Sequence, residues 1–291
     1  MLTTLDGLQL QTPVVVPRAD FSLSHDDSIL LVGSCFTDHM GERLQRAGFH
    51  TLTNPFGVLY NPCSIAACLT RCFEATPVTS DDLVFHDGLW HSWLHHGSFS
   101  SVDKEQCLAL CNKSMTDAHD FLRSCSTVIV TLGTAYVYYL KNQDSKGRVV
   151  ANCHRLPADR FVRRLLSVEE CVSALLSLPL QGKRVIFTVS PIRHLADGAH
   201  GNQLSKSTLL LALEQYAQQV EATYFPAYEI VLDELRDYRF YERDMVHPSP
   251  LAIDIVWQRF QSCFFSSVTQ NACHQYEKQF RQQQHRPIAR N

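Results

Sequence analysis

The sequence lacks the features that mark membrane, secreted and nucleic-acid-binding proteins. No apolar run approaches the roughly 20 residues needed to span a bilayer, and residues 1–6 lack the basic and then apolar profile of a signal peptide. The formal net charge is only −3, which provides no general attraction to nucleic acid, and the local basic group at 160–164 is interpreted as a solvated helix face. We therefore expect a cytoplasmic protein without a membrane or nucleic-acid partner.

Signatures of cofactor binding and of disulfides are missing as well. The sequence has no GxGxxG motif and no P-loop, so nothing predicts a site for a nucleotide phosphate, and no cofactor is expected. The eleven cysteines form no CxxC pair, and most of them occupy apolar positions of helical patterns. This distribution favours reduced, mostly buried thiols over disulfides.

What the sequence does contain is typical of a globular α/β protein. Hydrophobic residues make up 45% and charged residues 19% of the 291 residues, which is enough apolar material for a sizeable core. Strand-like apolar runs alternate with helical patterns, and this predicts a parallel sheet of about five strands covered by helices on both faces. Strands are expected at 28–33, 50–53, 127–133, 184–189 and 228–232, and helices at 38–48, 64–74, 103–124, 167–178, 202–222 and 250–265.

The predicted α/β domain has additions at both ends and two insertions. An irregular arm, the domain itself and a polar helix or tail are expected at 1–27, 28–266 and 267–291. Pro13 and Pro17 argue against a central strand in the arm. The helical period disappears at about 76–102 and 136–160, where hairpins are predicted. We interpret these insertions as a lid or substrate-binding lobe over the carboxyl edge of the sheet.

Candidate chemistry lies at the end of the first strand, at Gly33-Ser34. A serine at this strand-to-helix turn has its hydroxyl at the carboxyl edge of the sheet, near the positive end of a helix dipole. Such a hydroxyl needs a histidine that a carboxylate orients. Asp244 and His247 lie three residues apart on one predicted loop. The combination predicts nucleophilic catalysis by Ser34, with His247 as base and Asp244 as its partner.

Cys35 is a rival nucleophile, because a thiol at a helix N-terminus has a lowered pKa. Successive residues point in different directions, so only one of Ser34 and Cys35 is able to face His247. We expect Ser34 to take that position and Cys35 to be packed inside. The non-catalytic alternative is that Ser34 is simply a small residue that a tight turn requires.

The same stretch resembles a known family. Gly33-Ser34-Cys35-Phe36 followed by Thr37 is close to the motif of the GSCFA domain family, whose usual fifth residue is alanine. The resemblance extends over about 28–262 and includes Asn54-Pro55-Phe56-Gly57, Tyr60-Asn61-Pro62, Leu132-Gly133-Thr134-Ala135, Ser190-Pro191-Ile192-Arg193-His194 and Asp233-Glu234-Leu235-Arg236-Asp237-Tyr238-Arg239-Phe240-Tyr241. It implies an SGNH (GDSL-like) hydrolase fold, which is a flavodoxin-like three-layer α/β/α sandwich. It also implies chemistry on acyl esters, often of carbohydrate, with Ser34, Asp244 and His247 as the catalytic residues.

The oxyanion site implied by this resemblance is incomplete. Backbone N–H groups of Ser34 and Gly57 are its expected donors. The block that normally contributes a side-chain amide reads Gly133-Thr134-Ala135-Tyr136 here, so that amide is missing. Asn54 and Asn61 are the candidates to replace it. Loss of one oxyanion donor typically costs about 10²–10³ in rate.

Further residues are candidates for binding the substrate at the same edge of the sheet. They are Gly133, Thr134, Arg193, His194, His95 and His96. Arg193 and His194 are placed to hold a substrate anion, whereas His95 and His96 are expected to line the inserted lobe. Together with His91 these two form the most metal-like cluster, but no neighbouring cysteine or acid completes a site, and no metal is expected.

We therefore predict a serine esterase that acts on small-molecule or carbohydrate O-acyl esters, acetyl esters first among them. An O-acyltransferase that uses the same residues is the alternative, because a sugar hydroxyl is able to replace water in the second step. A binding module that keeps the fold without the activity is the alternative of another class, and the missing amide favours it. No oligomeric state is predicted.

Overall fold

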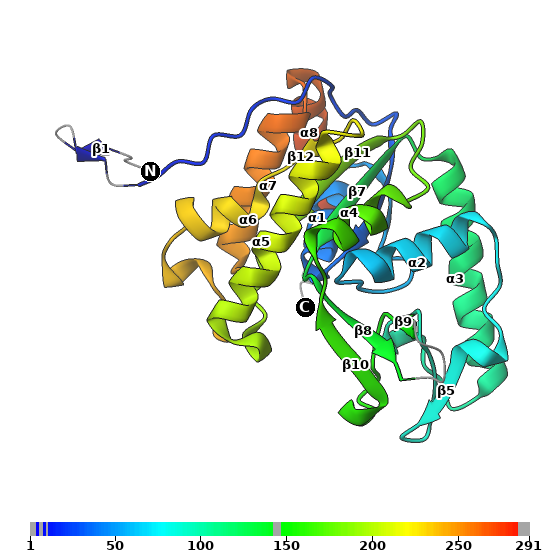
Figure 1. Cartoon of the computed structure of the whole chain (residues 1–291). Coiled ribbons are helices and arrows are strands. Elements are labelled where there is room, and N and C mark those ends of the chain that lie inside the picture. Colours follow the sequence, from blue (N-terminus) through cyan, green and yellow to red (C-terminus); the bar gives the residue numbers. More distant parts are fainter. Residues whose placement is uncertain (1–3, 6–7, 10, 142–146, 285–291) are drawn as a thin grey trace, which may run out of the picture.

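Three mostly apolar runs of the chain, 28–33, 127–132 and 184–189, form the middle strands of the central parallel sheet (Figure 1). The computed structural model describes residues 4–5, 8–9, 11–141 and 147–284. The five strands are β3 Ser28–Gly33, β4 His50–Thr53, β7 Thr127–Leu132, β11 Arg184–Val189 and β12 Thr223–Tyr224. Their order across the sheet is β12-β11-β7-β3-β4, which is the flavodoxin-like order with its switch point between β3 and β7. The predicted fold class is confirmed.

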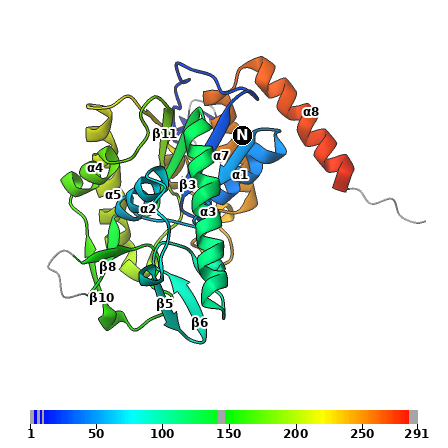
Figure 2. The ribbon, with the colours of Figure 1, turned by 90° about the vertical axis from the view of Figure 1, so that its right-hand side faces the viewer.

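Helices cover both faces of this sheet. The side chains of a strand alternate between the two faces, so an apolar strand presents apolar side chains on both of them. Ile29 and Leu31 belong to a buried cluster with α1 (Cys35–Arg46) and α7 (Pro250–Phe264). Leu30 and Val32 belong to the cluster on the opposite face. That face is covered by α2 Pro62–Phe73, α3 Lys104–Ser124, α4 Val168–Leu176 and α5 Gly198–Ala217 (Figures 1 and 2). The three-layer arrangement follows from this division of the core.

The start of α1 differs from the prediction in a way that matters for the site. The sequence indicated a helix from about residue 38, but α1 begins at Cys35 with Ser34 as its N-cap. The Ser34 side chain accepts a hydrogen bond from the N–H of Phe36, as serine does at helix starts. A cap three residues earlier changes which side chain of the motif faces outward.

The prediction of a strand at 228–232 is wrong. Residues Ala227–Glu229 form a single helical turn, α6, and Ile230–Glu234 continue it as a wider turn. The fifth strand is the two-residue β12, which lies before this segment. The apolar pattern of a short buried segment does not distinguish a strand from a helix. The two residues of β12 are too few to show the alternating pattern of a strand.

Both predicted hairpins are present, and the second is part of a small sheet. β5 Leu83–His86 pairs with β6 Leu89–Ser92, and β8 Tyr136–Leu140 pairs with β9 Arg148–Val150. The segment 160–164 is not a helix face: β10 Phe161–Leu165 adds to β8 as a third antiparallel strand. The guanidinium groups of Arg163 and Arg164 lie over the rings of Tyr136 and Tyr139 on β8. Figure 1 shows this sheet beyond the carboxyl end of β7.

The N-terminal arm lies against the end of α7. The arm pairs with the end of α7 through backbone hydrogen bonds from Leu23 to Phe264 and from Ala19 to Cys263. The last helix, α8 Ser267–Gln284, contacts α1 and then projects from the body of the molecule (Figure 2). Near the N-terminus, β1 Thr4–Leu5 and β2 Leu8–Gln9 form a short hairpin. Within the described residues, no helix has both the length and the apolarity to cross a membrane.

Candidate functional site

The turn between β3 and α1 is tightly packed around Ser34. Gly33 has φ of +146°, and a Cβ on it would lie 2.2 Å from the carbonyl oxygen of Thr131, so only glycine fits there. The N–H of Ser34 donates to that same carbonyl at 3.2 Å, and its Oγ accepts from the Phe36 N–H at 3.3 Å. The residue is only 1% exposed. Ser34 therefore serves the turn and the start of the helix.

Cys35 takes the position that the sequence had suggested for Ser34. Its Sγ lies 4.0 Å from Nε2 of His247, and it lines a cavity of about 500 Å³ that His247 also lines. The expectation that Ser34 faces the histidine while Cys35 is packed inside is thus reversed. The physical reason is the early helix start: the cap residue turns its side chain back onto the helix, and the next residue projects from the first turn.

The predicted histidine and aspartate are brought together as expected. His247 Nδ1 and Asp244 Oδ2 are 2.6 Å apart, and Asp244 Oδ1 accepts from the backbone N–H groups of Val246 and His247 at 2.9 and 3.0 Å. The hydrogen bonds from His247 and Val246 hold the pKa of Asp244 at about 2. A carboxylate on Nδ1 keeps the ring proton there and leaves the Nε2 lone pair toward the Cys35 thiol.

Burial works against the thiolate form of Cys35. It raises the pKa of the thiol, and the negative charge of Asp38 raises it further. The backbone N–H groups of Cys35 and Phe36, together with Lys206, oppose this by lowering the pKa. Burial therefore favours the neutral thiol, and the ring nitrogen that faces it is His247 Nε2.

Three of the expected oxyanion donors are already used. The N–H of Ser34 donates to Thr131, and the N–H of Gly57 donates to the Asn54 carbonyl at 2.8 Å. Asn54 has φ of +42° and braces the turn: its Oδ1 accepts from the Gly33 N–H at 2.9 Å and its Nδ2 donates to Asp38 at 2.6 Å. The two backbone N–H groups are therefore not available to a substrate oxygen, and Asn54 is not among the residues that line the cavity.

Asn61 is the remaining candidate, and it lines the cavity. Its Oδ1 caps α2 by accepting from the Ser64 N–H at 2.8 Å, which orients the amide. The residue is 5% exposed and lines the 500 Å³ cavity with Cys35. Among the described residues, neither its Nδ2 nor the backbone N–H of Cys35 has a hydrogen-bond acceptor on another residue. These two N–H groups are donors at the cavity without an acceptor among the described residues.

The other walls of the cavity come from the insertion and from the end of β11. Tyr136, Tyr138 and Arg163 of the small sheet line it, so part of the segment 136–160 does contribute to the site. The ring of Tyr136 stacks under the Arg163 guanidinium at 3.8 Å, and Arg163 is ion-paired with Asp197. Tyr60 lines the cavity as well, and burial raises the pKa of its hydroxyl to about 12, so the hydroxyl keeps its proton.

Of the residues expected to bind substrate, those near β7 and β11 reach the cavity. Thr134, Arg193 and His194 line it. Burial, with the nearby Lys206 charge, lowers the pKa of His194 to about 4, so its imidazole is neutral at physiological pH. Gly133 lies behind them: its N–H donates to the Tyr60 carbonyl, and a Cβ on it would lie 3.1 Å from Tyr60.

The histidines of the first insertion do not line this cavity, which corrects the prediction. His95 is fully buried, and its Nδ1 forms a hydrogen bond with the Ser92 hydroxyl at 2.9 Å. Burial lowers the pKa of its imidazole to about 4. The Cβ of His96 packs against Gly57. The ring of His91 contacts Ser100. Within the described ranges, no group of three or more histidine, cysteine or acidic side chains is placed to hold a metal ion.

Lys206 is a buried residue of the site that the sequence did not reveal. It is 1% exposed, and its Nζ donates to the carbonyl oxygens of Gly133 and Ser190 at 2.6 and 2.7 Å. Burial lowers its pKa to about 7, and Cys35 acts in the opposite direction. The lysine ties together the carboxyl ends of β7 and β11 behind the cavity. A single lysine in the helical pattern of 202–222 looks like a surface residue, so no sequence signal distinguishes it.

The capping role of Ser34 predicts a change in stability. Ser34→Ala removes the acceptor for the Phe36 N–H and should lower the free energy of unfolding by about 0.5–2 kcal/mol, measured by urea denaturation. Thr37→Val is a matched control, because the buried Thr37 hydroxyl has no hydrogen-bond partner among the described residues and its removal should cost nothing. A Ser34→Ala protein as stable as the unmodified one would contradict the assignment.

The chain is similar to known proteins in both sequence and structure. The model of the GSCFA family matches residues 28–260. The solved structures similar to this one include a Bacteroides fragilis protein described as a "putative acylhydrolase", with a TM-score of 0.41 and 10% sequence identity. The match covers 89% of this chain and 92% of that chain. The comparison with curated proteins found no match. Because the family model spans most of the chain, from β3 into α7, this protein belongs to the GSCFA family.

Proposed function

We propose that the protein is a thiol-dependent acyl-transfer enzyme in which Cys35, His247 and Asp244 act as nucleophile, base and orienting acid. One observation carries the proposal. Cys35 Sγ lies 4.0 Å from His247 Nε2, His247 Nδ1 lies 2.6 Å from Asp244 Oδ2, and both Cys35 and His247 line the cavity. A cavity of about 500 Å³ lies within the range of small-ligand sites. Nucleophile, base and third group in this order are the recurring arrangement of covalent acyl transfer.

The proposed reaction begins with proton transfer from Cys35 Sγ to His247 Nε2. The thiolate attacks the acyl carbon of an ester, a bond forms between sulfur and carbon, and the carbonyl oxygen becomes an oxyanion. Collapse of this intermediate breaks the bond to the alcohol oxygen, which receives the proton from His247. The product on the enzyme is a thioester at Cys35. Water, deprotonated by His247, attacks the thioester, releases the carboxylic acid and returns the proton to sulfur.

The oxyanion of this reaction is assigned to different donors from those expected from the sequence. The N–H of Cys35 lies in the first turn of α1, where the helix dipole favours negative charge. The amide Nδ2 of Asn61 lines the same cavity and has no acceptor among the described residues. Asn61 thus replaces the amide that is missing at Gly133-Thr134-Ala135. Donors fixed before the reaction stabilise the developing charge without reorganisation.

An O-acyltransferase is the second candidate, and the size of the cavity favours it. About 500 Å³ is far more than a short acyl group and one water molecule fill, since a water occupies about 30 Å³ in the liquid. The lining includes aromatic, amide and guanidinium groups from Tyr136, Asn152 and Arg163. This mixture suits a polyhydroxy acceptor, whose hydroxyl would attack the thioester in place of water.

Trapping the acyl-enzyme tests the proposal directly. We expect 4-nitrophenyl acetate, followed by an acid quench, to add the mass of one acetyl group to the peptide that contains Cys35, and hydroxylamine to remove it. His247→Ala should abolish the modification, because the base is lost. Addition of a sugar acceptor during turnover separates the two candidates by product: free acetate or acetylated sugar. No acetyl group on any residue would favour a binding module, and acetylation at Ser34 would support a serine enzyme instead.

A further inference from the structure

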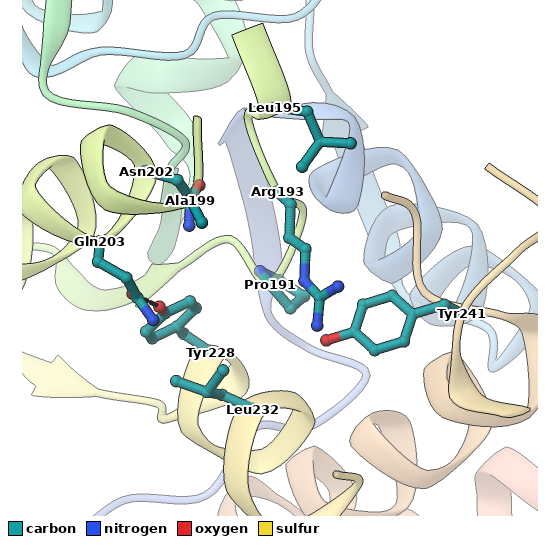
Figure 3. A pocket seen from close by; sticks show the side chains of 9 residues that line it. All are labelled: Pro191, Arg193, Leu195, Ala199, Asn202, Gln203, Tyr228, Leu232 and Tyr241. Atoms are coloured by element: carbon teal, nitrogen blue, oxygen red, sulfur yellow. Dashed lines mark hydrogen bonds between the residues drawn. The ribbon is translucent and has the colours of Figure 1, made fainter. Parts of the chain in front are cut away.

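A second, smaller cavity shares Arg193 with the first (Figure 3). Its volume is about 250 Å³, which is below the range of sites that hold a whole small ligand. In Figure 3, Arg193 and Tyr241 face Gln203 and Tyr228 across the space. Arg193 lines both cavities. The smaller one is therefore suited to hold one end of a molecule whose other end lies near Cys35.

Arg193 lacks the partner that its charge calls for. The guanidinium lies over the ring of Tyr241 at 4.1 Å, and its side chain makes one long hydrogen bond, from Nη1 to the Met245 carbonyl at 3.5 Å. No described carboxylate forms an ion pair with it, whereas Arg163, the other arginine of the larger cavity, is paired with Asp197. A guanidinium presents five donors and matches the oxygens of a carboxylate or phosphate.

The remaining polar groups of the small cavity also favour an anion. Gln203 Oε1 accepts from the Tyr228 hydroxyl at 2.5 Å, which leaves the amide Nε2 of Gln203 as a donor. None of the described residues that line this cavity is acidic. Asn202 contributes a second amide, whose Oδ1 accepts from the His194 N–H. One cation, two amide donors and no negative charge from these lining residues make a site that a bound oxyanion would complete.

Arg193 is placed on the side of the reaction where the alcohol leaves. Its backbone N–H donates to the Val246 carbonyl at 3.3 Å, and its side chain reaches Met245, the two residues that precede His247. In the proposed function, His247 protonates the alcohol oxygen, so the alcohol half of the ester lies beside His247. Resting on that proposed function, we propose that the small cavity binds an oxyanion group, carboxylate or phosphate, carried by the alcohol half of the ester or by the acyl acceptor.

Esters that differ only in this charge provide the test. For the full-length protein, kcat/KM is measured with 3-acetoxybenzoate, with 3-acetoxyphenyl phosphate and with the uncharged 3-acetoxybenzamide. We expect the charged esters to be preferred, and Arg193→Gln to reduce that preference about 10- to 100-fold, since hydrogen bonds between charged groups are lost. Gln203→Glu, which keeps an acceptor for Tyr228 while adding a negative charge, should reduce it as well. Arg281→Gln, at an exposed site on α8, removes the same charge far away and should leave the preference unchanged.

An equal preference in the unmodified protein and in Arg193→Gln would overturn the inference. Each charged ester has a preference over the uncharged ester, and Arg193→Gln reduces that preference by some factor. The charged ester with the larger reduction identifies the bound group as carboxylate or phosphate. Failure of the proposed function would look different, because none of the three esters would acetylate Cys35. In that case calorimetric binding of 3-hydroxybenzoate still decides: weaker binding to Arg193→Gln supports the anion site, and unchanged binding or none to either protein overturns it.

Discussion

Cys35→Ala is expected to lower kcat/KM for 4-nitrophenyl acetate by at least about 10³-fold, because among the described residues no other nucleophile has a contact with His247. Removing a member of a catalytic triad costs 10⁴- to 10⁶-fold in well-studied enzymes, and the smaller figure allows for residual catalysis by the oxyanion donors. The decisive measurement is steady-state hydrolysis combined with the mass of the Cys35 peptide. Alkylation by iodoacetamide should inactivate the unmodified protein through the same residue.

Two matched variants separate the thiol from its surroundings. Cys153 lines the same cavity, but burial raises the pKa of its thiol to about 11, and no imidazole contact is described for its sulfur. Cys153→Ala should retain acetylation at Cys35. Ser34→Ala should retain it too, although the protein is less stable. Loss of acetylation in Ser34→Ala with its retention in Cys35→Ala would restore the serine mechanism and refute the thiol mechanism.

Asp244→Asn is expected to cause the second-largest loss, about 10²- to 10⁴-fold in kcat. The amide oxygen would still accept from the backbone N–H groups of Val246 and His247, so the loop should keep its shape. The amide N–H₂ would then face His247 Nδ1 and favour the tautomer with the proton on Nε2. A protonated Nε2 has no lone pair to accept the proton of the Cys35 thiol. His247 would then be unable to act as the base, although its side chain is still present.

Asp237→Asn is the control for this change. Asp237 is also exposed, and its pKa is likewise held at about 2, by the side chain and backbone of Arg239, but it does not contact the histidine. We expect its kcat to remain close to that of the unmodified protein, as measured in the same ester assay. If Asp244→Asn were as active as Asp237→Asn, Asp244 would have no orienting role in the reaction.

Burial and nearby charges have opposite effects on the formation of a thiolate at Cys35. Burial disfavours the thiolate, whereas the N-terminus of α1 and Lys206 favour it. Lys206 is held by the carbonyl oxygens of Gly133 and Ser190, so this positive charge has a fixed position behind the cavity. A buried cation without a described carboxylate partner is costly. The formation of a thiolate at Cys35 would provide the opposite charge that the resting site lacks.

Much of the fold could be predicted because its signals are local. The runs at 28–33, 127–132 and 184–189 are mostly apolar, as is typical of strands covered on both faces, and each is followed by a helical pattern. The pair Asp244 and His247 could also be predicted, since three residues on one loop suffice to bring a carboxylate to a ring nitrogen. The segment after Pro226 could not, because its buried apolar residues pack against α7 in a turn rather than extending along β11.

The sequence alone determined that the turn at Gly33-Ser34-Cys35, a histidine and an aspartate would meet at the carboxyl edge of a parallel sheet. Only the tertiary structure decided which side chain of that turn faces His247 and which amide lines the cavity beside it. Ser34 and Cys35 are neighbours, and the choice between them depends on where α1 begins, which in turn depends on Gly33 packing against Thr131. Asn54 and Asn61 are likewise equal candidates in the sequence. In the structure, the Asn54 side chain forms hydrogen bonds within the turn, whereas Asn61 lines the cavity. Side-chain direction is set by packing between segments far apart in the chain, and no local pattern records it.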